Sequence, residues 1–111
     1  MNLFNSFSTM IDGMPTQGII GALELERRMI DDDFARKRTL PLEEARSILS
    51  FCHFIEAVRQ GSQISPVALP ILHVGFYRKT VRRLIEAESL PLEAGEQFEN
   101  IFSHVLFESA A

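Results

Sequence analysis

The sequence has little cysteine, no tryptophan and no long apolar run. Cys52 is the one cysteine among 111 residues, so it cannot form a disulfide within the chain, and nothing indicates an oxidising compartment. Residues 1–14 contain no basic residue and no long apolar stretch, so we do not expect a signal peptide. No stretch reaches the roughly 20 apolar residues of a membrane-spanning helix. We therefore expect a cytoplasmic protein without a membrane span.

Phenylalanine and charge are what the sequence has in quantity. Nine Phe, 46% hydrophobic residues and 23% charged residues make an ordinary globular composition. Phenylalanine rings need no hydrogen-bond partner, so they can fill a core without polar compensation. A length of 111 residues fits one domain, and we take residues 1–111 as a single helical domain.

The charges are unevenly distributed along the chain. All 11 Lys and Arg residues precede residue 84, whereas residues 84–111 hold six Glu and no basic residue. Segregation of this kind favours docking of the acidic end on a basic part of the same chain or of another. The net charge of −4 argues against a protein dedicated to nucleic-acid binding.

The spacing of apolar residues predicts an all-α protein, a compact bundle of four to five short antiparallel helices. Pro41 and Pro91 fit the first helical position, where the missing N–H costs nothing, and Gly61 fits the end of a helix. The links between the helices are short, which favours antiparallel neighbours. The expected helices cover residues 2–12, 19–38, 41–60, 66–88 and 91–108.

Three parts of this assignment stay open. Residues 19–30 alternate enough to form a short hairpin, although acid-before-base pairs four residues apart favour a helix. The Asp31-Asp32-Asp33 run lacks the alternating ligands and the glycine of a calcium loop, so we expect a solvated helix face or a break in the helix. Pro70 should kink or restart the helix expected over residues 66–88.

One short pattern occurs twice. Residues 39–43 and 89–93 share the sequence Leu-Pro-Leu-Glu, and the apolar positions that follow match over residues 39–55 and 89–105. A duplicated helical hairpin would produce this similarity. Two helices that use the same start signal independently would also produce it, and we favour this explanation because five residues carry little information.

The sequence shows no catalytic motif, nucleotide-binding loop or metal-ligand spacing, and we expect a protein that is not an enzyme and has no cofactor. His53, His73 and His104 are not four apart on one helix face, as paired metal ligands are. We expect His73 to be half-buried and bonded to a backbone carbonyl. Cys52 lies within an apolar stripe, which predicts an unreactive core thiol.

The most suggestive charged feature is a basic arc on the fourth expected helix. Its members lie one turn apart, so their like charges repel by a few tenths of a kcal/mol unless an anion answers them. Nucleic-acid phosphate, an acidic partner, or the chain's own Glu93, Glu96 and Glu99 could supply that anion, and the chain's own acids are the simplest source. The basic arc consists of Arg78, Lys79, Arg82 and Arg83.

The first expected helix is amphipathic and is followed by Gly13 and Pro15, so we expect residues 1–15 to be able to detach from the bundle. Its large apolar side chains need a cover, because each contributes roughly 1.5–3 kcal/mol when fully buried. Leu72 and Phe76 fall off the core face of their helix and need a cover too. A homodimer would cover both surfaces. The first helix presents Leu3, Phe4, Phe7, Met10, Ile11 and Met14.

These features predict a non-enzymatic interaction or assembly module that binds a second copy or a protein partner through apolar helix faces. The alternative is a small nucleic-acid-binding regulator that uses the basic arc. The candidate partner-binding residues are Leu3, Phe4, Phe7, Met10, Ile11, Leu72, Phe76, Arg78, Lys79, Arg82 and Arg83.

Overall fold

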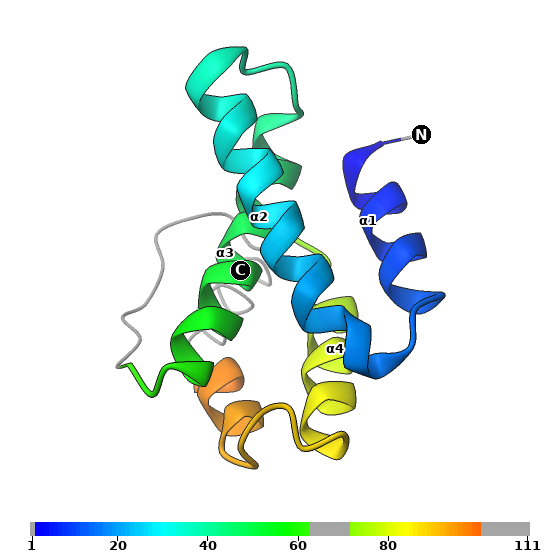
Figure 1. The fold of residues 1–111 in the computed structure, drawn as a ribbon, viewed down its shortest axis with the longest axis vertical. Coiled ribbons are helices and arrows are strands. Elements are labelled where there is room, and N and C mark those ends of the chain that lie inside the picture. Colours follow the sequence, from blue (N-terminus) through cyan, green and yellow to red (C-terminus); the bar gives the residue numbers. More distant parts are fainter. Residues whose placement is uncertain (1, 63–71, 101–111) are drawn as a thin grey trace, which may run out of the picture.

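A computed structural model describes residues 2–62 and 72–100 and confirms the all-α fold (Figure 1). Within these two ranges the regular structure is entirely helical and no strand occurs. None of the helices there is both long and apolar enough to cross a membrane. The elements are α1 (Leu3–Asp12), a short 3-10 helix η1 (Thr16–Gly18), α2 (Ile19–Arg36), α3 (Leu42–Arg59) and α4 (Val74–Glu86), and residues 94–100 are also helical.

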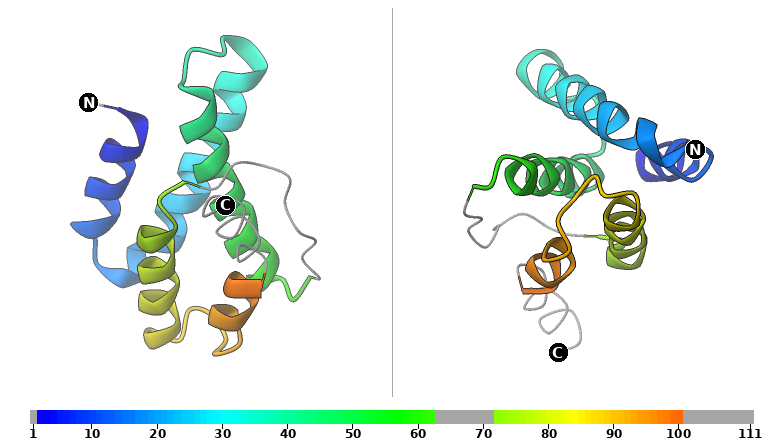
Figure 2. Two further views of the ribbon diagram at one scale, coloured as in Figure 1. Left: turned by 180° about the vertical axis from the view of Figure 1, so that it is seen from behind. Right: turned by 60° about the horizontal axis from the view of Figure 1, so that its bottom comes forward.

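Helix α1 has a cap at its start and a glycine at its end. The Asn2 side chain accepts a hydrogen bond from the backbone N–H of Asn5 at 2.7 Å, which satisfies one of the free donors of the first turn. Gly13 then ends the helix as predicted. The chain turns through η1 directly into α2, and α1 and α2 diverge from this turn (Figures 1 and 2).

Helix α2 runs without a break through the acidic run, which confirms the helix favoured for residues 19–30 and excludes both the hairpin alternative and a break at Asp31-Asp32-Asp33. Within the acidic run, the carboxylate of Asp33 binds the loop that follows the helix. It accepts hydrogen bonds from the backbone N–H of Thr39 at 3.0 Å and of Leu40 at 3.2 Å. The same carboxylate accepts a hydrogen bond from the Thr39 hydroxyl, so Asp33 holds the link between α2 and α3 in place.

Helix α3 forms the centre of the structure. Its side chains are buried over most of its circumference, because α2, α1, α4 and the last helical segment surround it (Figure 2).

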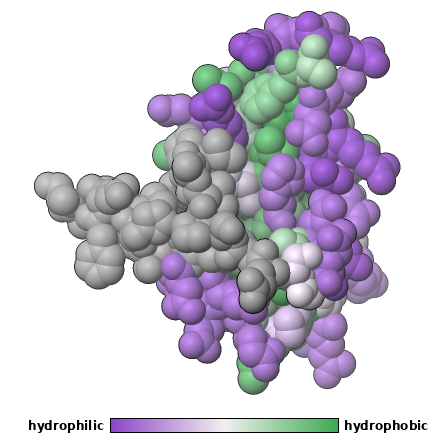
Figure 3. Space-filling view, turned by 90° about the vertical axis from the view of Figure 1, so that its left-hand side faces the viewer, coloured by the Kyte–Doolittle hydropathy of each residue, from purple (hydrophilic) through white to green (hydrophobic). Residues whose placement is uncertain are grey.

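Leu42 is the first helical residue of α3, so Pro41 precedes the helix as its cap and does not occupy the first turn. On the side of the molecule shown in Figure 3, hydrophilic side chains border a narrow apolar strip. Ion pairs bridge α2 and α3, namely Arg27 with Glu56 at 3.1 Å and Arg59 with Glu24 at 3.2 Å.

Helix α4 is shorter than predicted. It begins at Val74, because His73 has a left-handed backbone with φ of 58° and cannot continue a helix from Leu72. The predicted start at Ser65 and Pro66, and the kink at Pro70, lie outside the described residues.

The last helical segment also starts later than predicted. Its helix begins at residue 94, three positions after Pro91, whereas α3 begins directly after Pro41. The two copies of the Leu-Pro-Leu-Glu pattern therefore open differently. The Ala45 N–H bonds to the carbonyl of Pro41, four residues back, but the Ala94 N–H bonds to Pro91, three residues back. The remainder of the helix predicted to residue 108 lies outside the described part of the chain.

Helices α3 and α4 end in the same type of turn with different residues at the left-handed position. After α3 this residue is Gly61 with φ of 70°, and after α4 it is Glu88 with φ of 59°. In both turns the next residue's N–H bonds to a carbonyl five residues back, from Ser62 to Ala57 and from Ser89 to Leu84.

Substitutions at the left-handed position of these two turns should change the free energy of unfolding in opposite directions. Gly61→Ala should lower the free energy of unfolding by about 1 kcal/mol, because a Cβ is strained at positive φ even though no atom lies within 4 Å of it. Glu88→Gly should raise it by about 0.5–1 kcal/mol for the converse reason. Urea unfolding followed by circular dichroism measures both. Equal signs for the two changes would contradict this explanation.

Candidate partner-binding surface

Helix α1 belongs to the core. Phe4, Phe7 and Ile11 are only 7%, 2% and 0% exposed. The Phe76 ring lies edge-on to both aromatic rings of α1, with centroid distances of 5.4 Å to Phe4 and 6.0 Å to Phe7. Among the apolar side chains of α1, Met10 is the most exposed, at 37%.

The cover that the sequence required for α1 and for Phe76 comes from within the chain, because they cover each other. Leu3, Met14 and Phe76 are partly buried against the same core. The homodimer and the detachment of residues 1–15 stay predictions, but the argument from uncovered side chains no longer supports them.

The segment that leads into α4 is tied to α3. Leu72 is half-buried, and its backbone N–H donates to the Ser47 hydroxyl at 2.9 Å. The Ser47 hydroxyl also lies 3.0 Å from the Tyr77 hydroxyl, and burial raises the pKa of Tyr77 well above its usual value. His73 is exposed, contrary to our prediction, and its ring stacks on Phe4 with a centroid distance of 3.7 Å.

Two of the four residues of the basic arc pair with acids of the same chain. Arg78 forms a two-pronged ion pair with Glu99, with the Nη2 to Oε2 distance at 3.1 Å, and Lys79 lies 3.4 Å from Asp12. The acidic C-terminal part thus supplies one of the anions, as the sequence predicted. Arg82 is exposed and makes no hydrogen bond or ion pair to the described residues.

Arg83 has a role that the sequence did not reveal. Its guanidinium donates to the backbone carbonyls of Ile11 at 3.1 Å and Met14 at 2.8 Å, and to the Thr16 hydroxyl at 3.3 Å. Ile11 lies in the last turn of α1, where carbonyls lack a partner within the helix, and Met14 and Thr16 lie in the turn that follows. Arg83 therefore fixes the turn between α1 and α2 from a position on α4.

The remaining candidates for chemistry do not gather. Cys52 is 3% exposed, and burial raises the pKa of its thiol to about 12, which confirms the predicted core thiol. His53 is exposed, and His104 lies outside the described residues. In the two described ranges, no group of three or more His, Cys, Asp or Glu side chains is placed to hold a metal ion.

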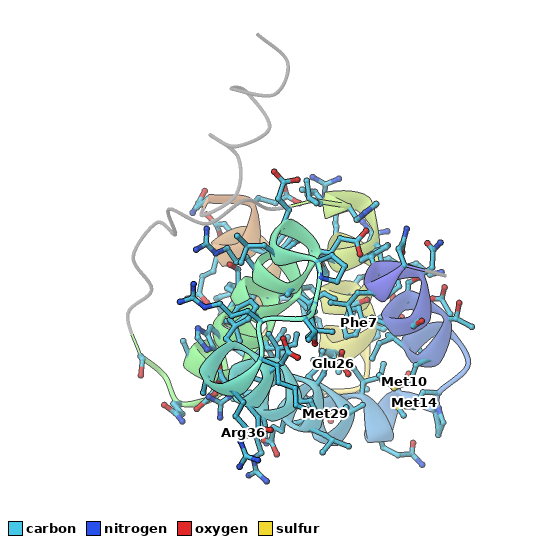
Figure 4. The ribbon with its side chains drawn as sticks, turned by 90° about the horizontal axis from the view of Figure 1, so that it is seen from above. Phe7, Met10, Met14, Glu26, Met29 and Arg36 are labelled. Carbon is cyan, nitrogen blue, oxygen red and sulfur yellow. The ribbon has the colours of Figure 1, made fainter. Side chains whose placement is uncertain are left out.

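An apolar surface lies exposed beside the space between α1 and α2 (Figure 4). From α2 come Leu25 and Met29, which lie one turn apart and are 59% and 58% exposed. From α1 comes Met10, which is 37% exposed, and from the turn after α1 comes Met14, which is half-buried. We call this surface the α1–α2 patch, and it consists of Met10, Met14, Leu25, Glu26 and Met29.

Glu26 is the polar member of the α1–α2 patch and was not among the residues singled out from the sequence. Its carboxylate is half-buried, and this desolvation raises its pKa above the usual value. Leu23, Glu26 and Ile30 are three and four residues apart, so Glu26 interrupts the buried stripe of α2. That interruption of an apolar stripe is the signal that could have identified it.

A shallow hollow of about 730 Å³ lies where α3 and α4 end. Its lining mixes apolar side chains, such as Val58 and Ile85, with the charged Arg59 and Glu88. Leu92 at its edge is 79% exposed. Arg59 already pairs with Glu24, and we find no convergent set of polar groups that would select a ligand.

Comparison of the chain with protein-family models, with curated proteins and with solved structures gave no match in any of the three.

Native protein should protect Cys52 from thiol reagents. Because its pKa is raised to about 12 and it is buried, the thiolate is both rare and inaccessible. With an aromatic disulfide reagent at pH 8, we expect labelling at least about a hundredfold slower in buffer than in denaturant. Labelling at the same rate in both would show that the thiol is accessible in the native state.

Removing Arg83 should cost much more stability than removing its neighbour Arg82. Arg83→Met keeps an unbranched apolar stem but removes three hydrogen bonds to the turn between α1 and α2, so we expect a loss of about 1–3 kcal/mol in the free energy of unfolding. Arg82→Met removes the same charge from an exposed side chain and should change stability by less than about 0.5 kcal/mol. Equal losses in urea titrations would reject the specific role of Arg83.

Proposed function

We propose that this protein is a non-enzymatic interaction module that binds a protein partner through the α1–α2 patch. The observation that supports the proposal is the pair Leu25 and Met29, more than half exposed and one turn apart on α2. Scattered exposed apolar residues are ordinary on protein surfaces, but apolar residues gathered from two helices are typical of interaction sites.

The composition of the patch suits recognition of a protein surface. Three of the four methionines in the sequence belong to it, namely Met10, Met14 and Met29. Methionine side chains are unbranched and polarisable, so they adapt to the shape of a partner at low energetic cost. An extended apolar strip flanked by charged residues matches an apolar helix face better than it matches a small molecule, which requires a concave pocket.

The proposal relocates the binding site within the chain. Of the residues that the sequence suggested for partner binding, only Met10 belongs to the α1–α2 patch. The others lie mainly along the contact between α1 and α4, where Phe4, Phe7 and Phe76 pack against one another. A second copy of the chain remains an alternative occupant of the patch, in keeping with the predicted homodimer.

Photo-crosslinking from the patch tests this function. Met29→p-benzoylphenylalanine in the full chain, irradiated in extracts of the cells that produce it, should give a discrete adduct of raised mass. The matched control is Gln97→p-benzoylphenylalanine, an exposed position on the last helical segment. Adding Leu25→Gln should abolish the adduct, because it removes a neighbouring apolar contact.

The mass of the adduct identifies the class of partner. An adduct of twice the chain's 12.6 kDa indicates a second copy, and light scattering at tens of micromolar should then show a dimer. Any other mass, with the adduct sequenced by mass spectrometry, indicates a different protein. If position 29 gives no more adduct than position 97, the proposed function is wrong.

A further inference from the structure

We propose that the partner is an amphipathic helix with a lysine or arginine within its apolar face, and that this cation pairs with Glu26 when the helix binds the α1–α2 patch. The inference rests on the proposed function and names the chemistry of the partner. It depends on charge complementarity: the patch holds an acidic group whose counter-charge is absent from the described part of the chain.

Glu26 differs from the other half-buried acids. In the described ranges these are Glu26, Asp33, Glu44, Glu56 and Glu99. Four of them have partners. Asp33 accepts from Thr39 and Leu40, Glu44 accepts the Phe4 N–H at 3.2 Å, Glu56 pairs with Arg27, and Glu99 pairs with Arg78. Glu26 makes no hydrogen bond or ion pair with any described residue.

Two of the three basic residues of α2 are engaged elsewhere, and the third, Arg28, follows Glu26 by two positions, which places it on the opposite side of the helix. Arg27 lies toward α3, where it pairs with Glu56 at 3.1 Å and lies 3.8 Å from Asp31. Arg36 pairs with Asp32 at 2.9 Å. The patch therefore combines apolar surface with a partly desolvated negative charge, and a cation brought by a partner would favour that charged form.

The geometry favours a helix as the bound element. Figure 4 labels Met10 on α1 and Met14 in the turn after it, on the side of α1 that faces Glu26 and Met29 of α2. Phe7, three residues before Met10, is buried in the core, so Met10 and Met14 are the side chains that α1 and its turn offer to a partner. A helix bound beside them would present apolar residues at three- and four-residue spacing.

A second copy of the chain fits this site less well. A two-fold contact through the patch would bring the same acidic residue from both copies, and Arg36, the basic side chain labelled nearby in Figure 4, already pairs with Asp32. An anionic lipid surface fits less well too, because the patch carries a negative charge of its own.

Selection from a displayed peptide library tests the inference without a known partner. The probe is a library of 18-residue helix-forming peptides with one face randomised, selected against the immobilised full chain and depleted against Glu26→Lys. We expect the enriched peptides to share a Lys or Arg between apolar residues of that face.

Binding of one enriched peptide then locates the contact. Glu26→Gln should weaken binding about tenfold, while Glu96→Gln, which removes the same charge from an exposed position, should leave it unchanged. Carbon-13 methyl signals of Met10 and Met29 should shift on titration. Circular dichroism checks that Glu26→Gln is folded, as expected when a partly desolvated charge is removed.

The outcomes separate this inference from the proposed function. Failure to enrich basic peptides, an equal effect of Glu26→Gln and Glu96→Gln, or unshifted methionine signals would each overturn the Glu26 pairing. The proposed function is judged independently, because a crosslink from position 29 does not depend on the sequence of the partner.

Discussion

The burial of α3 on all sides is the constraint on which the rest of the structure depends. Leu49 and Phe51 are 8% and 0% exposed, although their spacing of two residues places them on opposite sides of the helix. Phe51 stacks on Tyr77 of α4 at 4.5 Å, while Phe54 meets Phe98 of the last helical segment at 5.7 Å. An amphipathic helix needs one neighbour, but a helix that is apolar over most of its circumference needs several. The surrounding elements therefore bury their apolar faces against α3.

This arrangement decides where a binding surface can lie. In the elements around α3, the apolar side chains that face α3 are buried against it. An uncovered apolar surface must therefore lie on the other sides of these elements. On α2 that flank carries Leu25 and Met29, beside α1, which diverges from α2 beyond the turn (Figure 1). Elsewhere on the described helices, much of the outward surface is engaged in ion pairs, such as Arg59 with Glu24.

Local patterns in the sequence predicted the helices, while contacts between distant residues decided the rest. The three- and four-residue apolar spacing placed α2 and α3 within a few residues, and the uneven charge distribution predicted the docking of the acidic end that Arg78 and Glu99 carry out. The start of α4 could not be predicted, because it depends on a left-handed backbone at His73, a residue that seldom adopts one. The packing of Phe76 against α1 could not be predicted either, because residue spacing shows that a helix face is apolar but not which other face packs against it. The patch at Glu26 was missed for the same reason.

The contact made by Arg83 has a consequence for the order in which the chain acquires its structure. The guanidinium and the Ile11 carbonyl that it binds are 72 residues apart in the sequence. During synthesis α1 leaves the ribosome well before α4, and a ten-residue helix is marginal in water by itself. Its aromatic neighbour Phe76 and its clamp Arg83 are both translated long afterwards. The contacts that fix α1 against α4 can therefore form only after α4 has emerged, long after Phe4 and Phe7 have been translated.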